Sequence, residues 1–172
     1  MARYLIEQGH KNIAILSAET TDISVGQLRL KGYKRALTEN GIAIDEDLIC
    51  PMKDDVEFYS MENGYVVASE LLERRKDVTA IFAISDVLAV GACRAIKDKG
   101  LKIPNDIAVC GYDGIDMGQY YNPSITTVKQ PVDDIAKEAI KLLFNIISKK
   151  QEHQHKVYDA ELLVRESTTI VR

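Results

Sequence analysis

Strand-like and helix-like stretches alternate along this chain, and this alternation limits the folds it can adopt more than any other feature. An apolar run at 78–84 leads directly into a helical pattern at 86–99, and a second apolar run follows at 107–112. Alternation of this kind is typical of an α/β fold with a parallel sheet. The other predicted strands lie at 12–17, 46–50, 125–129 and 157–164, and the other predicted helices at 1–8, at 25–40, from residue 61 and from residue 133.

The charge balance and the cysteines argue against several classes of function. The net charge is −4, whereas proteins that bind nucleic acid carry a basic surface, so we do not expect this chain alone to bind DNA. Cys50, Cys93 and Cys110 are far apart and form no C-x-x-C pair, which favours buried thiols in a reducing cytosol. No apolar run approaches the roughly 20 residues that span a membrane. The first nine residues lack the features of a signal peptide.

Polar residues stand where two of the predicted strands end. Ser85 and Asp86 follow the run at 78–84, and Asp113 follows the run at 107–112. Ligands of open parallel sheets bind just beyond the carboxyl ends of the strands, so these residues are candidate ligand contacts. A carboxylate at Asp113 could accept hydrogen bonds from two sugar hydroxyls, but an Asp here could equally begin the next loop as a turn residue. Asp86 is predicted to cap the following helix, and Ser85 to contact the ligand.

Arg29 and Phe58 are two further candidates, each with a plainer alternative. Arg29 lies one turn into a predicted helix that follows a strand, and its planar donors suit hydroxyls or acids. An arginine on a solvated helix face would look the same in the sequence. Phe58 lies in a loop before a helix, where its ring could stack on a sugar or base, or could act as a hydrophobic staple for that helix.

The sequence offers little support for catalysis. It contains no Gly-x-Ser-x-Gly elbow and no phosphate loop, which are the signatures of common hydrolases and nucleotide-binding enzymes. His153 and His155 stand in a polar loop without the acids or cysteines of a metal site. We therefore expect a binding protein with no cofactor and no metal, and not an enzyme.

Six segments together resemble the LacI/GalR family of transcription regulators. Tyr4-Leu-Ile-Glu-Gln-Gly-His-Lys-Asn-Ile-Ala-Ile-Leu16 is similar to a helix–strand unit of that family, and Arg29-Leu-Lys-Gly-Tyr33 is similar to its Arg-x-x-Gly-aromatic motif. The most recognisable segment is Thr79-Ala-Ile-Phe-Ala-Ile-Ser-Asp-Val-Leu-Ala-Val-Gly91, continued by the stretch that ends in Val-Cys-Gly-Tyr-Asp113. Pro123-Ser-Ile-Thr-Thr-Val-Lys-Gln-Pro131 and Leu162-Leu-Val-Arg-Glu-Ser-Thr168 complete the set in family order.

The resemblance implies a two-lobed, periplasmic-binding-protein-like core with a small effector between the lobes. Arg29 and Asp113 match effector-contacting positions of the family, Ser85 matches a position that varies with the ligand, and Phe58 is a looser match to an aromatic contact. The effector would be a sugar, a sugar phosphate or a nucleobase.

The resemblance also implies how the chain divides. The helix-turn-helix domain of the family is absent from this chain. Residues 1–18 and 114–150 would form part of an N-terminal lobe, and residues 19–113 and 151–172 a complete, Rossmann-like C-terminal lobe.

We therefore expect the effector-binding and dimerising part of a bacterial transcription regulator, most simply a repressor. It would act in the cytoplasm as a homodimer and reach operator DNA only through the missing domain. A solute-binding protein of a sugar transport or chemotaxis system is the alternative. A small enzyme that uses Asp86 and Asp113 is a third, because the two carboxylates could share one cleft.

Overall fold

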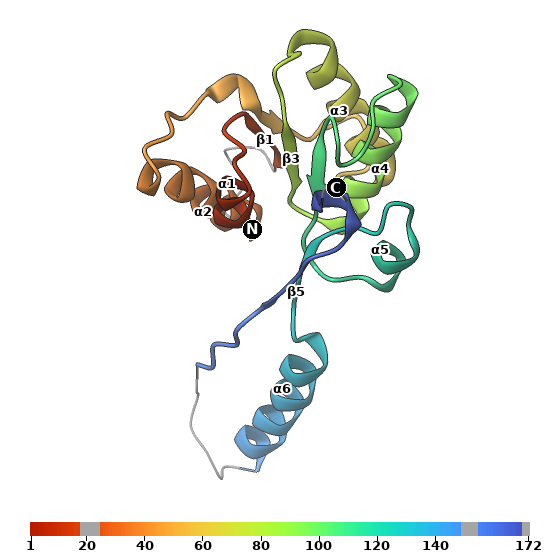
Figure 1. The fold of residues 1–172 in the computed structure, drawn as a ribbon. Coiled ribbons are helices and arrows are strands. Elements are labelled where there is room, and N and C mark those ends of the chain that lie inside the picture. The colour runs from red at the N-terminus through yellow and green to blue at the C-terminus, as the bar shows by residue number, and fades with distance from the viewer. Residues whose placement is uncertain (18–24, 149–154, 170–172) are drawn as a thin grey trace.

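A four-stranded parallel sheet forms the centre of the computed structural model, which describes residues 1–17, 25–148 and 155–169 (Figure 1). The strands follow the order β2-β1-β3-β4, and each neighbouring pair runs parallel. The loop at 18–24 and most of the polar loop at 149–155 lie outside the described residues. The strands are β1 (Ile13–Ser17), β2 (Ile49–Pro51), β3 (Ala80–Ala83) and β4 (Ala108–Cys110).

Helices cover both faces of this sheet, which explains why its strands are apolar throughout. Figure 1 shows one pair of helices on one side of the sheet and a second pair on the other. All residues of β1, β3 and β4 are buried. The first pair is α1 (Ala2–Glu7) and α2 (Val25–Glu39), and the second is α3 (Met61–Arg74) and α4 (Asp86–Asp98). The predicted α/β class with a parallel sheet is confirmed.

The position of β1 corrects the predicted division into lobes. Residues 1–18 were assigned to a different lobe from residues 19–113, but β1 pairs with β2 on one side and with β3 on the other. A strand with a parallel partner on each side cannot belong to a separate body. The first 17 residues therefore form part of the same layer structure as the rest of the sheet.

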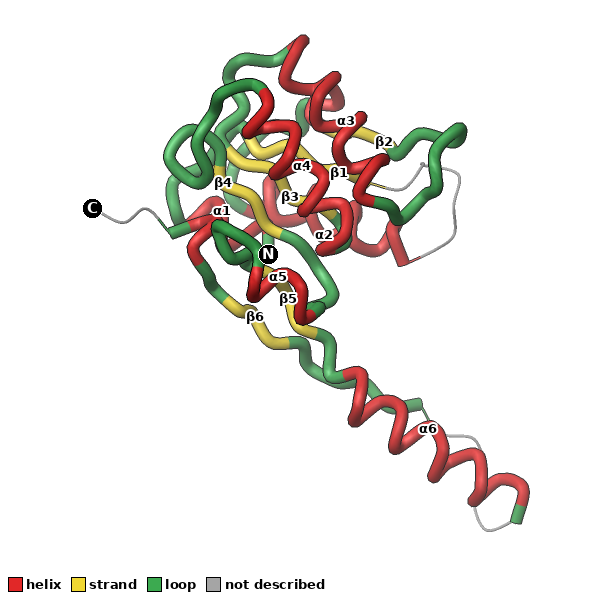
Figure 2. The backbone as a smooth tube through the Cα atoms, turned by 90° about the vertical axis from the view of Figure 1, so that its right-hand side faces the viewer, coloured by secondary structure: helices red, strands yellow, loops and turns green. Residues whose placement is uncertain are grey.

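The chain leaves the sheet after β4 and returns to it near the C-terminus. β5 (Thr127–Lys129) and β6 (Glu161–Leu163) pair antiparallel and form a two-stranded ribbon. Between them, α6 (Val132–Ile147) extends away from the rest of the molecule, as both views show (Figures 1 and 2). None of the residues of α6 is buried, although its sequence is strongly amphipathic.

Short elements account for most of the remaining differences from the prediction. The start of the stretch at 46–50 is a 3-10 turn, η1 (Glu46–Leu48), because the side chain of Asp45 accepts a hydrogen bond from the amide of Asp47. The loop after Asp113 contains a short helix that was not predicted, α5 (Asp116–Tyr120), and a second 3-10 turn, η2 (Glu166–Thr168), follows β6.

The three cysteines are free and buried, as expected from their apolar surroundings. Burial raises the pKa of the Cys93 thiol to about 12, which keeps it protonated and unreactive. Among the described residues, no helix is long and apolar enough to cross a membrane.

Candidate functional site

Arg29 and Asp113 meet at the carboxyl edge of the parallel sheet. Arg29 comes from the second turn of α2, and Asp113 follows the end of β4 by three residues. Arg29 Nη2 lies 3.2 Å from Asp113 Oδ1, and their side chains are only 11% and 30% exposed. Two candidates that are 84 residues apart in the sequence therefore form one half-buried ion pair.

The Arg29 side chain is held from two further directions. Its Nη1 donates a hydrogen bond to the carbonyl oxygen of Ile84, directly after β3. The centre of its guanidinium lies 3.9 Å from the centroid of the Tyr112 ring, close enough for a cation–π contact. These contacts fix the planar group at the edge of the sheet and decide against a solvated helix arginine.

Asp113 occupies an unusual backbone conformation. Its φ is +117°, and it is the only described residue other than glycine with a positive φ. A non-glycine residue in such a region costs of the order of 1–3 kcal/mol and persists only where its surroundings hold it. Its amide donates to the carbonyl of Val128 at 2.9 Å, and its carbonyl accepts from the amide of Gln130 at 3.3 Å.

Gln130 is a member of the site that the sequence reasoning did not find. Its Nε2 donates a hydrogen bond of 2.7 Å to Asp113 Oδ1, the same oxygen that Arg29 contacts. An isolated parallel bridge between Asp113 and Lys129 brings the two segments side by side. Gln130 stands in one of the family-like segments, but a role for it depends on this long-range pairing, which the sequence does not reveal.

The environment of Asp113 perturbs its acidity. Burial raises the pKa of this carboxyl above its ordinary value, while the charge of Arg29 and the hydrogen bond from Gln130 pull the pKa back down. Because the two partners oppose the desolvation, they favour the carboxylate form, which accepts hydrogen bonds only.

The helix cap falls to Ser85 and not to Asp86, which corrects the role that the sequence predicted for each. Ser85 is the N-cap of α4, and its Oγ accepts a hydrogen bond of 3.2 Å from the amide of Leu88. Asp86 is the first residue of the helix, and its carboxylate instead accepts from the amides of Gly114 and Ile115. Ser85 follows Ile84, whose carbonyl holds Arg29, so it stands next to the ion pair, although 97% of its surface is buried.

Phe58 lies apart from these residues. It is partly buried against the hydrophobic core, and its ring centroid is 6.4 Å from that of Tyr59. Neither of the two hollows that border the ion pair includes it. The structure does not bring Phe58 together with Arg29 and Asp113, and its ring packs against the hydrophobic core instead.

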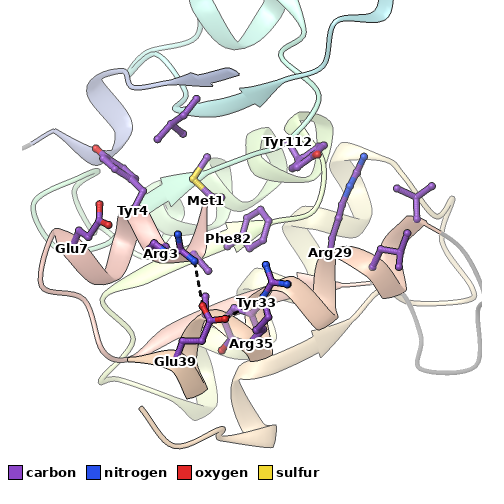
Figure 3. Close-up of a pocket in the computed structure, with 16 residues that line it drawn as sticks. Met1, Arg3, Tyr4, Glu7, Arg29, Tyr33, Arg35, Glu39, Phe82 and Tyr112 are labelled. Atoms are coloured by element: carbon purple, nitrogen blue, oxygen red, sulfur yellow. Dashed lines mark hydrogen bonds and ion pairs between the residues drawn. The ribbon is translucent and has the colours of Figure 1, made fainter. Parts of the chain in front are cut away.

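Two hollows open on either side of the ion pair. One, of about 680 Å³, is lined by Arg29, Tyr112 and Phe82 and extends between α1 and α2, as Figure 3 shows. The other has about the same volume and is lined by Asp113 and Gln130 together with residues at the start of α6. Both volumes lie within the range of small-molecule sites, about 300–1,000 Å³. The arrangement places donors and an acceptor next to open space, and its described residues include no nucleophile–base pair.

Open parallel sheets bind their ligands at the carboxyl edge, which is where this charged pair and the two hollows lie. The chain belongs to the family of periplasmic binding protein-like domains, whose model matches residues 2–168. Within that family its relatives are transcription regulators of the LacI type, which confirms the resemblance found in the sequence.

Three comparisons show how close these relatives are. The chain is 46% identical to the HTH-type transcriptional regulator MalR of Clostridium butyricum over 165 residues, which cover 96% of this chain and 48% of MalR. It is 39% identical to the HTH-type transcriptional repressor PurR of Histophilus somni, again over 96% of this chain and 48% of PurR. A structure of the regulator CelR in complex with cellobiose superposes with a TM-score of 0.87 at 33% identity, over 96% of this chain and 49% of CelR. The chain thus spans about half the length of the curated relatives that it matches.

Proposed function

We propose that this chain is the effector-binding portion of a LacI-type transcription regulator and that it binds a sugar-like molecule at the Arg29–Asp113–Gln130 cluster. The observation that carries the proposal is the meeting of Arg29 and Asp113 at the edge of the sheet. Gln130 and Arg29 both bond Asp113 Oδ1. In the part of the chain that the structure describes, this leaves Oδ2 available to a ligand hydroxyl.

A polyol is the ligand class that best fits this cluster. Adjacent sugar hydroxyls need one acceptor and one or two donors at fixed positions, which a carboxylate, a guanidinium and an amide supply together. The Tyr112 ring lies under the guanidinium and adds an apolar face. CelR, which shares this fold, is known in complex with cellobiose. A sugar phosphate or a nucleobase stays within the proposed class, because Arg29 could equally meet a phosphate.

The relatives favour a regulator over a solute-binding protein of a transport system. MalR and PurR carry the HTH-type description, and about half of their length has no counterpart in this chain. We propose that a helix-turn-helix domain outside these 172 residues contacts operator DNA. The regulator would work in the bacterial cytoplasm, as a homodimer and as a repressor. The ligand would be bound without being transformed.

The exposed helix α6 supports a second lobe. We propose that α6 packs against a part of the relatives' chain that has no counterpart in these 172 residues. Large apolar side chains of α6 are exposed: Phe144 is 64% exposed and Ile147 is 67% exposed. A ligand bound between the lobes could then bias their closure, and it would shift the equilibrium only by its difference in affinity for the two states.

Ligand-dependent thermal unfolding tests the proposed function. The probes are cellobiose, ribose, glucose 6-phosphate and hypoxanthine, each added to the 172-residue chain over a concentration series. A ligand at about 100 times its dissociation constant should stabilise the fold by about 2.7 kcal/mol. Asp113→Asn and Arg29→Gln should each weaken binding by about tenfold or more, because each removes a charge-assisted hydrogen bond of about 1.5–3 kcal/mol.

The exposed pair Arg94–Asp98 on α4 provides a matched control, because it is also an Arg–Asp pair, at 2.8 Å. Arg94→Gln and Asp98→Asn should leave the ligand-dependent shift unchanged. Asparagine is chosen at position 113 because it tolerates a positive φ better than alanine. A shift that survives both site variants would place the ligand elsewhere, and the absence of a shift with all four probes would contradict the proposed ligand class.

A further inference from the structure

Asp86 is a fully buried carboxylate that supports a segment of backbone and not its own helix. It is 0% exposed. Its Oδ2 accepts hydrogen bonds of 2.8 Å from the amide of Gly114 and 2.9 Å from the amide of Ile115. In return, the amide of Asp86 donates a bond of 2.7 Å to the carbonyl of Tyr112. These three bonds enclose Asp113, the carboxylate of the proposed binding site, on both sides along the chain.

The segment that Asp86 holds cannot relax easily. Asp113 has a φ of +117° and Gly114 a φ of +77°, so two successive residues adopt conformations with positive φ. A Cβ at position 114 would lie 2.7 Å from Cα of Lys129, which shows how closely the two segments pass. A residue other than glycine rarely keeps a positive φ unless specific contacts hold its backbone there. Two side chains hold this turn through hydrogen bonds from its backbone amides. Asp86 accepts from Gly114 and Ile115, and Thr127 Oγ1 accepts from Gly114 at 3.2 Å.

The end of β4 leaves just enough space for this carboxylate. A Cβ at position 111 would lie 2.1 Å from Asp86 Oδ1, so only glycine fits there. Oδ1 is buried and has no hydrogen-bond partner among the described residues. Burial also raises the pKa of Asp86, which means that the fold places the charged form there at a cost. The two amides that donate to Oδ2 offset this cost, and an apolar side chain would leave both of them without an acceptor.

We propose that Asp86 is a positioning residue that presents the Asp113 carboxylate to Arg29, Gln130 and the ligand. By fixing the amides of Gly114 and Ile115, it keeps Asp113 in its positive-φ conformation and so sets the direction of its side chain. Asp86 itself does not touch the ligand, because its surface is completely buried. The relevance of Asp86 to binding depends on the function proposed above, but its effect on Asp113 does not.

Nuclear magnetic resonance of the isotope-labelled chain tests this role without a ligand. Asp86→Asn keeps an acceptor oxygen of the same shape but removes the charge, and Asp86→Ala removes the acceptor. The readouts are the side-chain amide signals of Gln130, which report its bond to Asp113, and the pH titration of the Asp113 carboxyl carbon. Ser60→Ala is the control, since it removes the N-cap bond of α3, of 3.0 Å to the amide of Asn63, and no bond to the turn at Asp113.

We expect both Asp86 variants to shift the Gln130 side-chain signals and the titration midpoint of Asp113, with the alanine variant showing the larger change. Amide exchange at Gly114 and Ile115 should accelerate at least tenfold. Ser60→Ala should lower the unfolding temperature and leave all of these signals in place, because helix capping alone does not affect Asp113.

The proposal is overturned if Gln130 and Asp113 keep their wild-type signals in the Asp86 variants, since Asp113 would then hold its conformation without Asp86. Should the alanine variant fail to fold, the asparagine variant decides by the same criterion. A loss of ligand binding with these signals unchanged would leave the proposed function standing and refute the positioning role.

Discussion

His10 shows how a single half-buried side chain can link stability to pH. It lies between α1 and β1, and its Nδ1 is 3.0 Å from the Oγ1 of Thr79, just before β3. Burial lowers the pKa of the imidazole below its ordinary value of 6.5. The folded state therefore prefers the neutral ring more strongly than the unfolded state does.

The sign of the effect follows from linkage. Above pH 6.5 the ring is neutral in both states, and its full contribution to stability is present. As the pH falls through this value, the unfolded state takes up a proton first, so the free energy of unfolding decreases until the folded-state pKa is reached. Urea titrations at about pH 7.5 and about pH 5 should show a larger loss of stability in the wild type than in His10→Gln. Equal losses in the two proteins would mean that His10 titrates alike in both states.

At the residue scale, the sequence indicated two members of the candidate site, Arg29 and Asp113, but not the residues that contact them. Arg29 and Asp113 could be predicted because each follows a strand that ends at the same edge of the sheet. Gln130 and Tyr112 could not, since their roles arise from contacts across segments that no local pattern encodes. Asp86 was predicted to cap α4 because an acidic residue after a strand is typical of a helix start, and Ser85 beside it proved to be the cap.

At the scale of elements, the packing of α3 on α4 depends on two glycines. A Cβ at Gly64 would lie 2.2 Å from the carbonyl oxygen of Leu88, and a Cβ at Gly91 would lie 2.0 Å from that of Met61. The helix backbones thus touch where these glycines face each other's helix. The close approach buries the inner faces of both helices and brings α4, with Ser85 and Asp86 at its start, against the sheet.

Gly91→Ala should lower the free energy of unfolding by at least about 1–3 kcal/mol, because the methyl group meets backbone that cannot move aside. Gly32→Ala is the matched control within α2, where a Cβ meets nothing within 4 Å. There alanine should stabilise the helix by about 0.5–1 kcal/mol through its higher helix propensity. Urea unfolding of the two variants measures both effects. A stabilising Gly91→Ala would show that the helices can separate without cost.

The elements themselves were largely predictable. Apolar periodicity and glycine stops located the strands of the sheet and its four covering helices. The short helix α5 was missed because its segment is rich in the Gly, Tyr, Asn and Pro residues that favour loops. The partner of each strand was not predictable from local patterns, and the lobe that the family resemblance implied for β1 was wrong.

At the scale of the whole molecule, the described chain consists of a helix-covered sheet and a segment that projects from it. The projecting segment begins at the ribbon of β5 and β6 and includes α6, none of whose residues is buried. The amphipathic pattern correctly predicted this helix, but its pattern alone could not show that the apolar face would lack a covering surface within the described part of the chain.

Replacing residues 131–159 with Asn-Gly should leave the fold of the sheet intact. Lys129 pairs with Glu161 in the antiparallel ribbon, so the remaining Gln130 and Ala160 would flank a two-residue turn of the type that Asn-Gly favours. Because α6 buries nothing, the unfolding temperature should change by no more than a few degrees. Circular dichroism and thermal unfolding check this outcome, and a shortened chain that does not fold would show that α6 stabilises the sheet.

The return of the chain to β4 has a mechanical consequence. Thr126, on the outgoing segment, donates its amide to the hydroxyl of Ser167 on the returning segment at 2.8 Å, and that hydroxyl donates to the carbonyl of Val109 at 2.5 Å. The segments that enter and leave α6 are thus both connected to β4 at Val109, four residues before Asp113. A displacement of α6 would therefore move both connecting segments together and would act on the edge of the sheet where Arg29 and Asp113 meet.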